Sequence, residues 1–181
     1  MSDESIIDAV NAVAGAWAVP GGVVVISDRE GVVLEHAFGW ADVERAVPAT
    51  ADHLFEIGSI SKIMTSTAIL QLVERGLLRL DDVPADLLDW LPPVLSGREI
   101  TIERLLRHSA GLVSGVDAVQ DEKAQLAGLD AGISPAPPGE IFHYSNLGYV
   151  LLGQVATRVT GRPLADLVAE GILARIGAGG S

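Results

Sequence analysis

The first forty residues change their hydrophobic spacing once, from a helical to a strand-like period. Apolar residues at positions 6, 7, 10, 13, 14 and 17 recur at helical spacing after a start rich in Ser, Asp and Glu. This pattern predicts an amphipathic helix over residues 6–19 that ends before Pro20. Residues 22–27 and 31–38 are β-branched runs joined by turn-forming residues, so they predict a β-hairpin.

Beyond residue 40 the apolar spacing is mainly helical. Residues 61–75 predict a largely buried helix that stops at Gly76, and residues 77–93, with their Asp and Pro, predict short helical turns and loop. Further helices are predicted over residues 102–107, after a Thr101 cap, and over residues 146–160 and 163–176. The stretch 113–140 is the least ordered in composition, with a helix expected near 121–126 and a proline-rich turn at 135–139.

Composition limits the classes of partner. The chain of 181 residues is 49% hydrophobic, enough for a buried core and a single domain over residues 1–181. A net charge of −12 repels phosphate backbones, so we expect no nucleic-acid partner. The chain has no cysteine, its start is acidic, and it lacks an apolar run long enough to span a bilayer, so we expect a cytoplasmic protein without disulfides or membrane contact.

A serine and a lysine stand one helical turn apart where a loop enters the apolar helix at 61–75. Ser59 is expected in the first helical turn, with Lys62 three residues further on the same face. A serine hydroxyl is a weak nucleophile until a base takes its proton, and a lysine can do so only when its environment favours the neutral amine. The alternative is that Ser59 or Ser61 caps the helix while Lys62 extends along its edge.

A second polar group precedes the helix at 146–160. Tyr144 could relay a proton, and Asn146 could orient Lys62 or a substrate amide. The alternatives are a half-buried aromatic with a satisfied hydroxyl for Tyr144 and a helix N-cap for Asn146.

Four ordered segments carry a family resemblance. They read FEIGSISK at 55–62, GLLRLDD at 76–82, ITIERLLRHSAGL at 100–112 and PGEIFHYSNLGYVLLG at 138–153. These segments resemble the class C serine β-lactamases and the related D-alanyl-D-alanine carboxypeptidases, D-aminopeptidases and β-lactamase-like carboxylesterases. The resemblance implies an α+β fold, an α/β sandwich of the β-lactamase/transpeptidase-like type.

The resemblance also implies roles for individual residues. Ser59 would be the acylated nucleophile, Lys62 its general base, Tyr144 a second acid/base group and Asn146 a substrate-orienting side chain. Ser145 would complete the turn, and His108 would be a structural, hydrogen-bonded histidine. The other three histidines, which lack metal-ligand spacing, are expected on the surface or in loops, and neither a metal nor a cofactor is expected; they are His36, His53 and His143.

One family motif has no counterpart in the chain. The Lys/His-Thr/Ser-Gly triplet, carried on an edge strand beside the nucleophile, is absent, as is the C-terminal half that holds it. We therefore expect an N-terminal helix and hairpin at 1–40 whose sheet lacks its C-terminal strands, a mostly helical part with the active-site motifs at 41–176, and a flexible tail at 177–181. We expect a complementary C-terminal chain, or self-association through exposed strands, to complete the site.

Two functions follow from these residues. The first is a serine hydrolase that forms an acyl-enzyme on a small ester, amide or lactam, either an esterase, a D-peptidase or a β-lactamase. The second is a catalytically inactive binding or assembly module that keeps the same helical domain. Covalent labelling of Ser59 discriminates between them.

Overall fold

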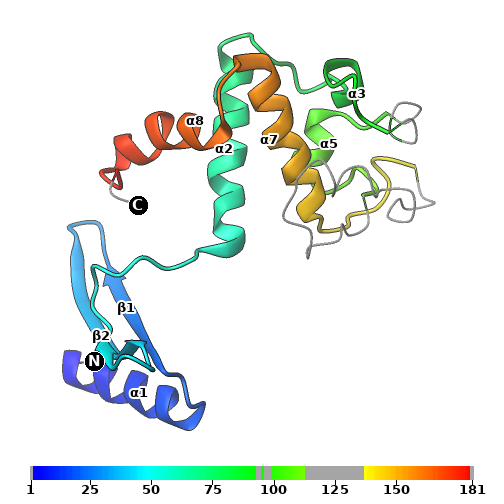
Figure 1. The fold of residues 1–181 in the computed structure, drawn as a ribbon. Helices are drawn as coiled ribbons and strands as arrows, with labels where there is room; N and C mark the ends of the chain where they lie inside the picture. The colour runs from blue at the N-terminus through cyan, green and yellow to red at the C-terminus, as the bar shows by residue number, and fades with distance from the viewer. Residues whose placement is uncertain (1, 93–94, 96–98, 113–136, 180–181) are drawn as a thin grey trace. The chain divides into compact units, whose positions relative to one another are not determined.

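The structure, a computed structural model, describes residues 2–92, 95, 99–112 and 137–179. The described residues form helices and a small antiparallel sheet, as expected for an α+β fold (Figure 1). The chain divides into two compact units, residues 1–56 and residues 57–181. The helix expected near 121–126 lies outside the described residues, and the single-domain organisation stays a prediction.

The first unit contains the predicted helix and hairpin. Helix α1 (Asp3–Ala16) begins after Ser2, whose side chain accepts a hydrogen bond from the Ser5 amide. Strands β1 (Gly21–Ser27) and β2 (Val32–Asp42) pair antiparallel, which confirms the hairpin, although β2 continues past the predicted end at residue 38. A third strand, β3 (Val47–Pro48), pairs with β2 and was not predicted, because two residues are too few to show alternation. The sheet order is β1-β2-β3.

A glycine inside β2 permits a close approach of the backbone. Gly39 has φ +66°, and a Cβ atom on it would lie 2.2 Å from the Pro20 carbonyl oxygen. Any larger residue would therefore clash with the chain entering β1, in addition to the cost of the left-handed backbone. Among the described strands β1 pairs only with β2, so its other edge carries unpaired backbone groups.

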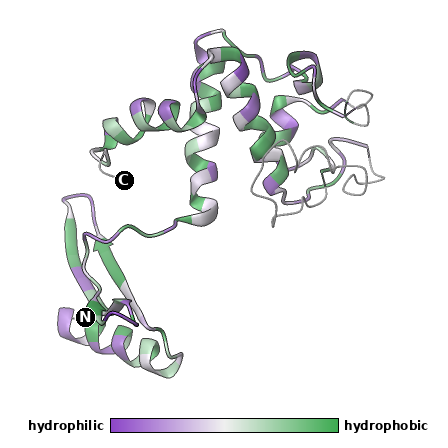
Figure 2. Cartoon of the chain, viewed as in Figure 1, coloured by the Kyte–Doolittle hydropathy of each residue, from purple (hydrophilic) through white to green (hydrophobic). Residues whose placement is uncertain are grey.

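The second unit is built on two helices with a shared core. Helix α2 (Ser61–Glu74) packs against α7 (Asn146–Thr160), with the short helices α3 (Pro84–Leu87) and α5 (Ile102–Leu106) beside α7 (Figure 1). The prediction for 146–160 is confirmed at both ends, because Ser145 caps the start and left-handed Gly161 ends the helix. The Thr101 cap is confirmed as well, since its side chain accepts a hydrogen bond from the Arg104 amide. Buried apolar residues of α2 and α7 belong to one core cluster, and hydrophobic residues colour much of α7 green in Figure 2.

Two expectations for this unit were wrong. Helix α2 is not largely buried: Ile69 is fully buried, but Ile63 is 64% exposed and Leu70 is 49% exposed. The helix expected over 163–176 is interrupted, because α8 (Leu164–Gly171) ends before a separate 3-10 turn, η3 (Leu173–Ile176). Pro163 precedes α8 instead of lying in its first turn.

The packing of α7 against its neighbours yields a stability prediction. Leu152 is fully buried in α7 within the core cluster, so Leu152→Ala should lower the free energy of unfolding by about 2–5 kcal/mol. The matched control is Leu70→Ala on the exposed face of α2, which should cost less than about 1 kcal/mol. Urea unfolding followed by circular dichroism measures both values, and equal losses would contradict this description of the core.

Candidate active site

The predicted serine and lysine meet at the entrance of α2. Ser59 lies in a 3-10 turn, η1 (Gly58–Ile60), that runs directly into α2. The predicted place of Ser59 in the first turn of the α-helix is therefore wrong, because the 3-10 turn precedes that helix. Lys62 Nζ donates a hydrogen bond to Ser59 Oγ at 3.4 Å. Lys62 lies in the first turn of α2, three residues after Ser59, so the two side chains are neighbours on the same face.

The second predicted pair arrives from the start of α7. The Tyr144 hydroxyl donates a hydrogen bond to Ser59 Oγ at 2.7 Å, and Lys62 Nζ donates one to Asn146 Oδ1 at 2.6 Å. The four side chains named from the sequence therefore form one hydrogen-bonded cluster within the second unit. The Ser59 hydroxyl contacts both the Lys62 amine and the Tyr144 phenol, and each of these groups can transfer a proton.

Ser145, between the two site residues, holds the start of α7. Its side chain is buried, 4% of the residue being exposed, and accepts a hydrogen bond from the Gly148 amide at 3.1 Å. Ser145 is thus the N-cap, and the alternative reading of Asn146 as the cap is wrong. With the cap supplied by its neighbour, Asn146 is the first helical residue and its amide oxygen meets Lys62.

His108 supports the Tyr144 segment from the other side. Its Nδ1 accepts a hydrogen bond from the Ser145 amide at 3.1 Å, and its ring stacks on the Tyr144 ring with centroids 4.5 Å apart. Burial lowers the pKa of His108, and the positive charge of Lys62 lowers it further. These contacts agree with the hydrogen-bonded histidine expected from the sequence.

The hydrogen bonds of the other three histidines go to residues outside the cluster of Ser59, Lys62, Tyr144 and Asn146. His36 is in β2 and not in a loop; it is half-buried, and its Nε2 is hydrogen-bonded to Asn11 Oδ1 at 3.0 Å. His53 Nδ1 accepts a hydrogen bond from the Thr50 amide at 3.0 Å. His143 belongs to the loop before Tyr144, as expected.

Lys62 and the neighbouring rings set the charge balance of the site. Nζ lies 4.8 Å from the Tyr144 ring centroid and 5.6 Å from that of Tyr149. Within the part of the chain that the structure describes, no carboxylate forms an ion pair with Lys62. Hydrogen bonding to Lys62 and then to Ser59 lowers the pKa of the Tyr144 phenol, because both interactions favour its anionic form.

Sequence reasoning missed one residue near the site, Tyr149. Its hydroxyl hydrogen-bonds to the Ser66 hydroxyl at 3.0 Å and donates to the Leu106 carbonyl oxygen at 3.2 Å, which ties α7 to α2 and α5. Its ring lies beside His108, with centroids 5.0 Å apart. The available signal was its position three residues after Asn146, on the same side of the helix.

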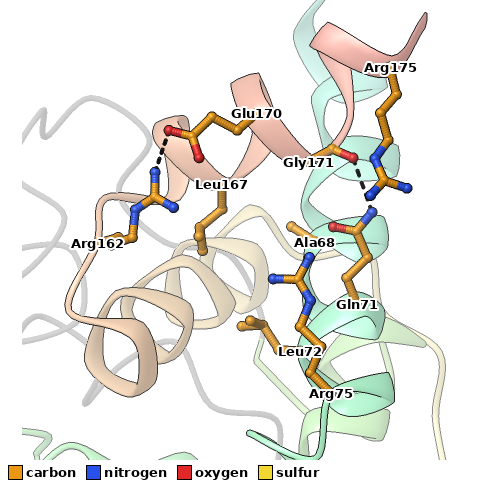
Figure 3. A pocket seen from close by; sticks show the side chains of 9 residues that line it. All are labelled: Ala68, Gln71, Leu72, Arg75, Arg162, Leu167, Glu170, Gly171 and Arg175. Atoms are coloured by element: carbon orange, nitrogen blue, oxygen red, sulfur yellow. Dashed lines mark hydrogen bonds and ion pairs between the residues drawn. The ribbon is translucent and has the colours of Figure 1, made fainter.

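A pocket between α2 and α8 is separate from this cluster. Its lining combines apolar and charged side chains, and Arg162 is paired with Glu170 at 2.6 Å (Figure 3). None of the four cluster side chains lines it. Nothing in its lining places it with the serine chemistry.

The described residues contain no group of three or more His, Cys, Asp or Glu side chains able to hold a metal ion. No helix among them is long and apolar enough to cross a membrane.

The chain that carries this cluster is similar in sequence to known proteins. The family model described as Beta-lactamase matches residues 9–179. Penicillin-binding protein 4 of Amycolatopsis lactamdurans is 30% identical over 166 residues, which cover 88% of this chain and 43% of that protein. The chain spans between 30% and 43% of the length of the curated relatives it matches.

Solved structures are similar in fold over nearly the whole chain. The octameric penicillin-binding protein homologue from Pyrococcus abyssi has a TM-score of 0.85 and 29% identity, covering 98% of this chain and 43% of that one. The D-amino acid amidase from Ochrobactrum anthropi SV3 has a TM-score of 0.78 and 26% identity, covering 97% of this chain and 50% of that one. The β-lactamase/transpeptidase-like fold class expected from the sequence is therefore confirmed.

The electrostatics of the cluster yield a titration prediction. The chain has two tyrosines, so Tyr149→Phe leaves Tyr144 as the only phenol. We expect it to ionise below the ordinary pKa of 10.0, and Lys62→Gln in the same background should move that ionisation upward. Tyrosinate absorbance followed against pH measures both values. Arg75→Gln, beyond the opposite end of α2, is the control and should leave the titration unchanged; ionisation at or above 10.0 with Lys62 present would contradict the description.

Proposed function

Since this chain belongs to the β-lactamase family, we propose that it carries the nucleophile-bearing part of a serine hydrolase that acts through an acyl-enzyme. The observation that supports this most directly is the set of contacts around one hydroxyl. Ser59 Oγ lies 3.4 Å from Lys62 Nζ and 2.7 Å from the Tyr144 hydroxyl, so a base and an acid are both within reach of the nucleophile.

The reaction starts with transfer of the Ser59 proton. In the proposed step, the neutral Lys62 amine accepts this proton as Ser59 Oγ bonds to the substrate carbonyl carbon. The tetrahedral intermediate collapses when the bond to the leaving group breaks, and the leaving group takes a proton from the Tyr144 hydroxyl. Water then attacks the Ser59 ester and gives its proton to the Tyr144 phenolate. The acid is released as the Ser59 oxygen takes back the proton held by Lys62, which restores the serine hydroxyl, the neutral amine and the phenol.

Two further features would stabilise these steps. Developing negative charge on the carbonyl oxygen lies near the N-terminal end of α2, where helix amides and the dipole are favourable to anions. Asn146 keeps Lys62 directed toward Ser59 through the 2.6 Å hydrogen bond and could in addition bind a substrate amide.

The substrate class follows from the reaction and from the relatives. Acyl-enzyme formation suits an ester, an amide or a lactam, and the similar proteins include a D-amino acid amidase and penicillin-binding proteins. We propose a small acyl substrate of this kind, with no cofactor. The cytoplasmic location expected from the sequence remains part of this proposal.

We further propose that full turnover needs elements beyond those described. The unpaired edge of β1 offers backbone groups to a further strand, and exposed apolar side chains flank the nucleophile in sequence at Ile57 and Ile60. A complementary C-terminal chain, or self-association through exposed strands, would cover these groups and add an oxyanion donor. Loss of a single such donor typically lowers turnover by about two to three orders of magnitude.

Covalent labelling tests the nucleophile. A fluorophosphonate, or a fluorescent penicillin, should form an adduct whose mass maps to Ser59 in protein purified from its own host cells, where any second chain stays bound. Ser59→Ala should abolish the adduct, and Ser61→Ala, two residues away at the start of α2, should keep it. An unlabelled Ser59 in that material would favour the inactive binding or assembly module instead.

Separate variants test the two proton-transferring groups. Lys62→Ala and Tyr144→Phe should each lower the rate of labelling by about 10²- to 10⁴-fold, because each removes a group in contact with Ser59 Oγ. Stopped-time labelling with a fluorescent fluorophosphonate measures the rates, and circular dichroism checks the fold. Arg75→Ala removes a cation from the far end of α2 and should label at the unaltered rate; a similar loss in this control would point to general destabilisation.

A further inference from the structure

His108 accepts hydrogen bonds from two backbone amides, one on each side of Tyr144. Its carbonyl oxygen accepts one from the His143 amide at 2.8 Å, and its Nδ1 accepts the other from the Ser145 amide at 3.1 Å. Its imidazole ring also stacks on the Tyr144 ring, at an interplanar angle of 28°. His108 thus contacts the backbone on both sides of Tyr144 and one face of the Tyr144 ring.

The backbone of His108 is unusual as well. Its φ of +56° lies in the left-handed region, which is uncommon for residues other than glycine. That turn, just after α5, lets the carbonyl oxygen and Nδ1 of the same residue reach the same segment. The strain is therefore consistent with a residue held in place for its contacts.

We infer that His108 is a positioning residue: its neutral imidazole holds the Tyr144–Asn146 segment so that the phenol reaches Ser59 and the amide oxygen reaches Lys62. The inference rests on the proposed function, because it concerns the same reaction. His108 acts through Tyr144 and Asn146 and does not itself contact Ser59.

The contact depends on the protonation state of the ring. Nδ1 can accept the Ser145 N–H only while it carries no proton, so the neutral ring must carry its proton on Nε2. A proton on Nδ1 places two donors face to face and breaks the bond. The segment would then lose one of its two backbone restraints, and acid would lower the activity through His108.

The groups around the ring favour the neutral form. Lys62 from α2 contributes positive charge, while the phenols of Tyr144 and Tyr149 contribute none when protonated. His143, in the loop before Tyr144, donates its backbone amide to the His108 carbonyl oxygen. On the side of α5, Arg107 is paired with Glu103 at 3.0 Å. The pKa of His108 is lowered by burial first and by Lys62 second, so protonation occurs below the ordinary histidine value of 6.5.

Two substitutions at His108 distinguish loss of the Nδ1 hydrogen-bond acceptor from any effect of the left-handed backbone. Both His108→Asn and His108→Gly tolerate the left-handed backbone, but only asparagine places an acceptor, Oδ1, where Nδ1 stands. His108→Gly should lower the fluorophosphonate labelling rate by about 10- to 100-fold at neutral pH, because a misplaced Tyr144 loses its contact with Ser59. His108→Asn should stay within about threefold of the wild-type rate.

The pH profile supplies a readout that a purely structural role would not change. The ratio of the His108→Asn rate to the wild-type rate should rise as the pH falls below 6.5, since asparagine cannot be protonated there. Any acid loss that arises elsewhere in the protein is common to both proteins and cancels in this ratio. His53→Asn is the matched control, because His53 Nδ1 also accepts a backbone amide but lies in the first unit, and its ratio should be flat.

Nuclear magnetic resonance tests the contact without any activity. In the full chain, the amide resonance of Ser145 should shift with the same midpoint as the His108 ring, and this shared transition should vanish in His108→Asn. A Ser145 amide that ignores the His108 titration, or a His108→Gly protein that labels at the wild-type rate, would overturn the inference. Absence of labelling in the wild-type protein at every pH would instead overturn the proposed function, and the resonance titration would still decide whether His108 holds the segment.

Discussion

The packing of α2 against α7 is the constraint on which the rest of the second unit depends. Ile69 and Leu72 from α2 share a buried core with Leu151, Leu152 and Val155 from α7. Because both helices are rigid, this apolar contact also determines where their N-terminal ends lie. The start of α2 carries the hydroxyl and the amine, and the start of α7 carries the phenol and the amide. The apolar core thus sets the polar geometry.

The site illustrates how neutral partners can surround a single amine. Lys62 meets hydroxyl and amide oxygens and aromatic faces, and the described residues offer it no carboxylate partner. An ion pair would hold the ammonium form and compete with proton transfer from Ser59, and the described residues supply no such pair. His108 extends the same logic, since only its neutral ring can accept the Ser145 amide.

Much of the local structure was predictable because its causes are local. The period of apolar residues, a serine or threonine cap and a left-handed glycine delimit α7 and α5 in the sequence itself. Failures came where local signals were short or ambiguous. Strand β3 has only two residues, η1 replaces the first turn expected for α2, and α8 ends at Gly171 before the separate turn η3.

The sequence by itself determined the family, the types of element and the four candidate residues, because motifs and periodicity are read along the chain. Only the tertiary structure decided that Lys62 Nζ and Asn146 Oδ1 lie 2.6 Å apart and that Ser145 caps α7. It also decided that His108 accepts the Ser145 amide and so holds the segment that carries Tyr144. The physical reason is separation along the chain. Contacts between residues some eighty positions apart depend on how helices pack in three dimensions, and no local propensity encodes that packing.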